Sequence, residues 1–181
     1  MQTLETERLF LRDWRESDLD DLFEYACNPN VGPNAGWGPH TDKGESLRIL
    51  HSFQESQDTW AIQVKENEKV IGSISLMADK FYPPETGKAK MLGYAMSFDY
   101  WGRGLMTEAA RRVLKFAFEE AGLDFVTCSH FPFNSRSKRV IEKCGFRYEQ
   151  TRSESFTNYR GEKLNELCYI ITRDNYFSNI K

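Results

Sequence analysis

A pair of glycines around an arginine, at the start of a long helical pattern, is the feature of this chain that predicts chemistry. The residues are Gly102, Arg103 and Gly104, and the strand-like run 89–96 precedes them. A strand that leads through a glycine turn into a helix aims several backbone N–H groups, and the positive end of the helix dipole, at one point. Such a point binds phosphate groups, so the sequence predicts an anion-binding turn here.

The residues around this turn argue against two common nucleotide-binding motifs. A dinucleotide fingerprint needs a third glycine where this chain has Thr107. Its ribose-binding acid follows at the end of the next strand, whereas Asp124 precedes that strand. The G-x-x-x-x-G-K-S/T pattern of a P-loop does not occur in the chain. The phosphate is therefore expected to belong to another cofactor.

Composition and charge restrict the class of protein. The 181 residues are 40% hydrophobic and 28% charged, with a net charge of −3 at pH 7, and we expect residues 1–181 to form one domain. The acidic balance argues against a broad nucleic-acid surface, which needs a basic face. No apolar run approaches the roughly 20 residues of a membrane span, and the first residues show no signal segment. We therefore expect a cytoplasmic protein without membrane or direct nucleic-acid binding.

The cysteines predict neither a disulfide framework nor a metal site. They stand at positions 27, 128, 144 and 168, form no C-x-x-C pair, and have no histidine at metal-ligand spacing. We expect free thiols and no metal.

The elements that must position the turn alternate between strand and helix. The pattern predicts the order βααβββαβαββ and an α+β fold with helices on both faces of a mixed sheet. Strands are expected near 8–14, 60–65, 69–77, 89–96, 125–130, 146–156 and 163–172. Helices are expected from Ser17, from Asp42, over 103–121 and over 135–143, with loops at 27–40 and 79–88. The unit 89–130 should pair its strands in parallel, or splay them where a ligand enters.

With these motifs in place, the chain resembles the GCN5-related N-acetyltransferase (GNAT) superfamily, whose acyl-CoA pyrophosphate loop has the pattern R/Q-x-x-G-x-G/A. The run 100–109, with Gly93 and Tyr94 upstream, resembles the branch that acetylates the N-termini of ribosomal proteins. Segments 6–12, 70–74 and 134–146 support the resemblance, which covers roughly residues 3–177. It implies the GNAT fold, with the central sheet splayed at the cofactor site.

The resemblance also implies acetyl-CoA as cosubstrate. Backbone N–H groups of residues 102–107 would hold the pyrophosphate, and backbone groups of residues 94–96 would hold the pantetheine arm as an added strand. The residues assigned to cofactor binding are Tyr94, Ala95, Met96, Trp101, Gly102, Arg103, Gly104, Leu105, Met106, Thr107, Asn134 and Ser137. Asn134 could instead be only the N-cap of the helix that follows it, and Ser137 only an exposed serine of its first turn.

Two positions depart from the family's loop pattern. Trp101 stands where arginine or glutamine is usual, which matters little because the loop acts through backbone N–H groups. Met106 stands where a small residue is usual, so its side chain must enter the packing under the sheet or narrow the cofactor groove.

The acceptor side is less well defined by the sequence. The family lines its acceptor pocket with the loop between its first two helices, which implies substrate contacts for Trp37 and His40 in the loop 27–40. A simply packed tryptophan is the alternative. The usual glutamate base is missing from strand 89–96, and Ile141 replaces the usual tyrosine acid. Ser137 is then the candidate group for the leaving thiolate, and His40 or a bound water is the candidate base.

The missing base bears on the acceptor. An α-amino group has a pKa near 8 and a lysine near 10.4, so about a tenth of the former and one part in 2,500 of the latter is neutral at pH 7. A site without a strong base therefore favours an N-terminal α-amine of a protein. A small amine, such as a polyamine or aminoglycoside, is the first alternative, and a non-catalytic acyl-CoA-binding module is the second. The chain could act as a monomer or a homodimer.

Overall fold

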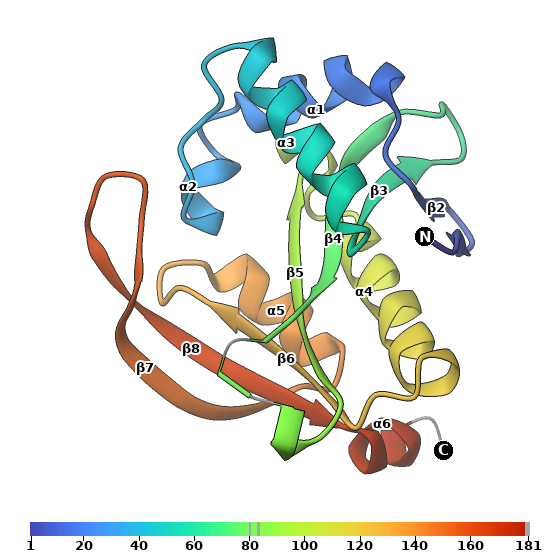
Figure 1. Ribbon diagram of the computed structural model, residues 1–181, viewed down its shortest axis with the longest axis vertical. Coiled ribbons are helices and arrows are strands. Elements are labelled where there is room, and N and C mark those ends of the chain that lie inside the picture. Colours follow the sequence, from blue (N-terminus) through green and yellow to red (C-terminus); the bar gives the residue numbers. More distant parts are fainter. Residues whose placement is uncertain (80, 83, 180–181) are drawn as a thin grey trace.

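The central element is one mixed sheet of eight strands in the order β1-β2-β3-β4-β5-β6-β8-β7 (Figure 1). The computed structural model describes residues 1–79, 81–82 and 84–179. The strands are β1 (Leu4–Glu5), β2 (Leu9–Arg12), β3 (Thr59–Val64), β4 (Val70–Met77), β5 (Ala89–Met96), β6 (Phe125–His130), β7 (Arg147–Thr157) and β8 (Lys163–Thr172). The helices are α1 (Leu19–Ala26), α2 (Gly32–Ala35), α3 (Lys43–Ser56), α4 (Leu105–Lys115), α5 (Ser135–Lys143) and α6 (Arg173–Asn179).

The predicted order and the α+β class are confirmed. Besides three short 3₁₀ helices, Glu16–Asp18, Pro84–Thr86 and Phe98–Tyr100, the described residues form three further short elements that were not predicted. These are β1, α6, and α2, which lies inside the expected loop 27–40. The helix predicted over 103–121 was too long at both ends. It begins at Leu105 because Gly102 and Gly104 adopt a φ of +77°, and a π-helical turn, Phe116–Glu120, replaces its last part. Residues 80 and 83 of the expected loop 79–88 lie outside the described residues.

Helices cover both faces of the sheet because neighbouring strand residues point to opposite sides. Ile62 of β3 packs in the larger core with Ala109 and Val113 of α4. The adjacent Ala61 packs in the second core with Leu50 of α3. Since α4 carries its apolar residues at intervals of four, one stripe of the helix is buried against the sheet.

The sheet opens between its two parallel strands. β5 pairs with β6 only from Ala89 opposite Phe125 to Met91 opposite Thr127. β4 continues to pair with β5 as far as Met96. The second half of β5 is thus separated from β6: the two strands pair in parallel at their start and splay beyond it, as the resemblance implied.

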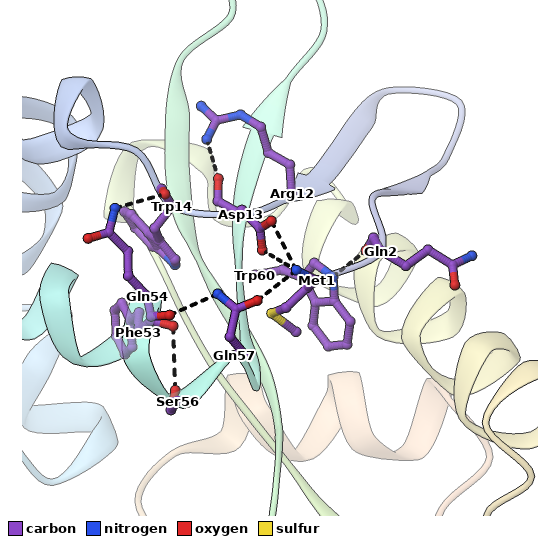
Figure 2. A network of polar contacts seen from close by, with 10 residues as sticks. All are labelled: Met1, Gln2, Arg12, Asp13, Trp14, Phe53, Gln54, Ser56, Gln57 and Trp60. Carbon is purple, nitrogen blue, oxygen red and sulfur yellow. Dashed lines mark hydrogen bonds and ion pairs between the residues drawn. The ribbon is translucent and has the colours of Figure 1, made fainter.

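A polar network ties the chain start to the end of α3 (Figure 2). The ammonium group of Met1 contacts the Asp13 carboxylate at 2.8 and 2.9 Å and the side-chain oxygen of Gln57 at 2.8 Å. The Phe53 ring packs 5.3 Å from the Trp14 ring, centroid to centroid. These contacts anchor α3, and α3 in turn lines the cleft described below.

Within the described residues, no helix is long and apolar enough to cross a bilayer.

Candidate functional site

A cleft of about 1020 Å³ occupies the opening between β5 and β6. We call its two ends the glycine-turn half and the aromatic half. The glycine-turn half is lined by Met96, Trp101, Gly102, Gly104, Met106, Thr107, Asn134, Arg136, Ser137, Arg139, Val140 and Lys143. The aromatic half includes Tyr25, Trp37, His40, Glu45, Phe131, Phe156, Tyr159 and Glu166. Of the residues assigned from sequence, Arg103 and Leu105 do not line the cleft.

The glycine turn presents open backbone to the cleft. Gly102 and Gly104 are exposed and share a φ of +77°, a conformation that other residues rarely adopt. A Cβ atom on Gly102 would meet no atom within 4 Å, and one on Gly104 would meet only Arg8 Nη2, at 3.8 Å. The N–H groups that start α4 follow at once. This open cradle at a helix N-terminus fits an anionic group.

Arg8 holds this turn against β2. Its Nε and Nη2 donate to the Glu108 carboxylate at 2.7 and 2.6 Å, and its Nη1 donates to the carbonyl of Arg103 at 3.1 Å. Burial favours the neutral acid, but hydrogen bonds from Thr6 and Arg8 hold the pKa of Glu108 below its ordinary value. The Arg8 guanidinium therefore neutralises the negative charge of Glu108, which lies in the first turn of α4.

The two departures from the expected loop pattern have structural explanations. The Trp101 indole N–H donates to the Met96 carbonyl at 2.9 Å, and the Arg136 guanidinium lies 4.8 Å from the Trp101 ring centroid. Trp101 thus joins the turn to β5 and α5. Met106 is 5% exposed and belongs to the larger core, so most of its side chain lies in the packing under the sheet. Arg103 is exposed and stacks 4.9 Å from the Tyr100 ring.

Cations gather along α5 in the glycine-turn half. Arg136, Arg139 and Lys143 all line the cleft there. No acidic residue is among the described residues that line this half. A polyanionic ligand therefore meets favourable charge in a chain that is acidic as a whole.

Asn134 is the N-cap of α5 and also a link between distant segments. Its side-chain oxygen accepts from the Ser137 N–H at 3.0 Å, and its amide donates to the carbonyl of Asn34 in α2 at 2.9 Å. The capping alternative is thus observed, and both ends of the amide have protein partners.

Ser137 faces the cleft and contacts a tyrosine from the sheet. Its Oγ lies 2.8 Å from the hydroxyl of Tyr94 in β5. Burial raises the pKa of the Tyr94 phenol well above its ordinary value, so the phenol stays protonated. The sequence had assigned Tyr94 a backbone role, and the side-chain contact across β5 and α5 was missed.

His40 and Trp37 lie together in the aromatic half. Their ring centroids are 5.3 Å apart, and His40 Nδ1 lies 2.8 Å from Ser46 Oγ. Burial lowers the pKa of His40, so its ring is neutral at pH 7. A Cβ on Gly32 would lie 2.4 Å from the Trp37 ring, so the tryptophan is packed as well as facing the cleft.

The β7–β8 hairpin covers one side of the aromatic half, since its residues Phe156 and Tyr159 line the cleft there. Figure 1 shows its tip beside α2, where the Tyr159 N–H donates to the Gly36 carbonyl at 3.1 Å. Added Cβ atoms would lie 2.4 Å from Phe156 at Gly36 and 2.9 Å from Tyr159 at Gly38. The breaker-rich loop thus uses its glycines to let aromatic rings approach the backbone.

Glu166 of β8 places a carboxylate in the aromatic half, and sequence reasoning missed it. Its two oxygens accept from Ser129 at 2.8 Å and from Ser155 at 2.7 Å. The side chain is half-buried and fixed by both hydroxyls. The alternation of β8 could have indicated an inward-facing acid, but only the fold shows which strand borders the cleft.

The described residues contain no group of three or more His, Cys, Asp or Glu side chains that could hold a metal ion. All four cysteines are free thiols. Burial raises the pKa of Cys128 and Cys144, the latter to about 11, so neither is a ready nucleophile at neutral pH.

Comparison of the sequence with known proteins identifies one family. The sequence model described as the acetyltransferase (GNAT) domain matches residues 8–147. The N-acetyltransferase p20 of Bacillus licheniformis is 29% identical over 155 residues, which are 82% of this chain and 84% of that protein.

Solved structures share the fold. A GNAT-family acetyltransferase from Bacillus anthracis superposes with a TM-score of 0.85 at 20% identity, over 96% of this chain and 99% of that one. A ribosomal-protein-S5-alanine acetyltransferase from Vibrio fischeri superposes with a TM-score of 0.73 at 19% identity, over 97% and 99% of the two chains.

Proposed function

Because this chain belongs to the GNAT family and is an acetyl-CoA-dependent N-acetyltransferase, we propose that its acceptor is the N-terminal α-amine of a protein or peptide. Glu166 carries the proposal, because it offers an ammonium group a carboxylate fixed by two hydroxyls, among the rings that line the aromatic half together with Glu45 and His40. We further propose that residues 1–181 act as one cytoplasmic domain, as a monomer or a homodimer.

The glycine-turn half supports acetyl-CoA as the occupant. The open cradle at Gly102 and the cations of α5 fit a pyrophosphate, and the exposed edge of β5 fits an amide-bearing arm. Acetyl-CoA supplies an activated thioester when bound. Of the expected backbone contacts, the Met96 carbonyl already accepts from Trp101.

The aromatic half supports amine binding and deprotonation. Glu166 holds the ammonium form by an ion pair and, directly or through water, accepts its proton. The aromatic walls exclude water around the nitrogen. His40 is neutral and can take a proton, so it remains the second candidate base.

Amine ionisation favours an α-amine over lysine. The pKa difference between the two groups, near 8 against about 10.4, corresponds to about 3 kcal/mol in the cost of forming the neutral nucleophile. The same cleft therefore acetylates an α-amine more readily at pH 7.

A small-molecule amine is the second candidate, and the β7–β8 hairpin favours it. The contact between Tyr159 and Gly36 narrows the path by which a peptide chain would leave the aromatic half. A compact amine needs no such path.

Mass spectrometry of reaction products tests the proposal. The panel contains peptides with a free α-amine and one internal lysine, the same peptides with a blocked N-terminus, a polyamine and an aminoglycoside. We expect an acetyl group on the α-amine of free peptides only. Acetylation of lysine, or of small amines alone, would contradict the acceptor class. Acetyl-CoA binding with no thiol release for any amine would favour a non-catalytic module.

A further inference from the structure

Ser137 and Tyr94 form a hydrogen-bonded pair in the lining of the cleft. Both residues line the cleft, and they come from different elements, α5 and β5. Ser137 Oγ lies 2.8 Å from the Tyr94 hydroxyl, whereas the Ser137 carbonyl lies 3.3 Å from it. Only the shorter distance is typical of an O–H···O hydrogen bond.

In this contact either hydroxyl can be the donor, and Ser137 Oγ is the nearer of the two acceptors within reach of the phenol proton. Because the phenol is held neutral by burial, it keeps its proton to donate. When the phenol is the donor, the Ser137 hydroxyl keeps its own proton for a second hydrogen bond. The Ser137 N–H is already used by the Asn134 cap, so the helix first turn is fixed while the hydroxyl proton stays available to the cleft.

The same face of α5 contains no other hydroxyl donor one turn further on. Ile141 follows Ser137 by four residues, which places both on one side of the helix, and Ile141 is 1% exposed. On this face of α5 the hydroxyl that lines the cleft is that of Ser137, which contacts the sheet through Tyr94.

We propose that Tyr94 is a positioning residue: its O–H donates to Ser137 Oγ and thereby directs the Ser137 O–H at the sulfur of the cosubstrate. The pair stabilises negative charge on sulfur as the C–S bond breaks and the electron pair leaves with the sulfur. No proton is consumed by the pair, because the hydroxyl acts as a hydrogen-bond donor only. This inference rests on the proposed role of Ser137 and is independent of which amine is the acceptor.

The test is the pKa of the thiol of bound coenzyme A, measured by the ultraviolet absorbance of the thiolate. The same titration is repeated on the complex with desulfo-coenzyme A, which has no thiol. Its absorbance change comes from the protein's own cysteines and tyrosines and is subtracted. Wild type, Tyr94→Phe, Ser137→Ala and the double variant are compared. Loss of one hydrogen bond to a charged group raises the pKa of the bound thiol by about 1 in each single variant.

The double variant separates positioning from independent action. Because Tyr94 acts through Ser137, we expect the double variant to match Ser137→Ala in both thiol pKa and kcat, with kcat about tenfold below wild type. The KM for acetyl-CoA should stay within about twofold in all variants.

Tyr169→Phe is the matched control. It removes a phenol contact on strand β8: the Tyr169 hydroxyl lies 3.2 Å from His130 Nε2, and Tyr169 itself, unlike His130, does not line the cleft. It should lower the melting temperature without moving the thiol pKa. The proposal is overturned if Tyr94→Phe behaves like this control, or if the effects of Tyr94→Phe and Ser137→Ala add. Neither outcome depends on the amine panel, so a wrong acceptor assignment is recognised separately.

Discussion

The two halves of the cleft differ in what they offer a ligand. The glycine-turn half presents backbone N–H groups at Gly102 and Gly104 and three cations along α5. The aromatic half presents side chains only, with Glu166 as a fixed carboxylate among rings. The glycine-turn half is suited to a polyanionic cosubstrate, and the aromatic half is suited to the acceptor amine. A substitution in one half should therefore change the binding of one ligand and leave the binding of the other ligand unchanged.

The largest effect is expected from Gly104→Asp. The substitution adds bulk and negative charge at a φ of +77°, where the turn must meet phosphate, so we expect the Kd for coenzyme A to rise at least 100-fold, about 2.7 kcal/mol. Calorimetry measures this. Gly122→Asp, at a φ of +68° beyond the cleft lining, controls for backbone strain. Unchanged affinity in Gly104→Asp would remove the turn from the cofactor site.

Glu166→Gln tests the other half. The amide keeps its size but cannot pair with an ammonium group or take its proton, so kcat/KM for the amine should fall about 30- to 100-fold. The Kd for coenzyme A should stay unchanged in calorimetry. Glu154→Gln, on the same hairpin but not lining the cleft, is the control. If coenzyme A affinity fell as well, the separation of the two halves would be wrong.

Arg8→Ala should weaken coenzyme A binding about three- to tenfold with no change in the KM for the amine. The turn loses its contact with the Arg103 carbonyl, and Glu108 loses its guanidinium partner while it keeps the hydrogen bonds from the Thr6 hydroxyl and the residue-8 N–H. Arg8→Lys keeps the charge but lacks the planar fork that spans both partners, so it should recover only part of the affinity. Full recovery by lysine would mean that charge alone matters.

The smallest effect is the pH dependence of the Arg8–Glu108 pair. The folded-state pKa of Glu108 lies below the unfolded value of about 4.5, so its contribution to the free energy of unfolding is present above that pH and is lost as pH falls through the folded value. Urea denaturation should show wild type losing more stability than Glu108→Gln between pH 5 and 3. Parallel losses would show that the pair contributes nothing to stability.

Local sequence determined the glycine-turn half. Glycine is needed where φ is positive, Asn134 caps the helix that follows it, and the apolar period of α4 sets its buried stripe. These are interactions between residues a few positions apart, so their types and spacing suffice to predict them. The ends of the helices were less predictable, since the π-helical turn Phe116–Glu120 contains no glycine or proline that would mark it.

The tertiary structure alone decided the aromatic half and the partners that support both halves. Glu166 reaches the cleft because β8, not β7, pairs with β6. Tyr94 meets Ser137, and Arg8 meets Glu108, across 43 and 100 residues of sequence. A single sequence records which side chains exist but not which distant strands become neighbours. Local residue types thus predicted an anion-binding turn, and the resemblance to the GNAT family added the cosubstrate, whereas the acceptor carboxylate and the contact between Ser137 and Tyr94 required the fold.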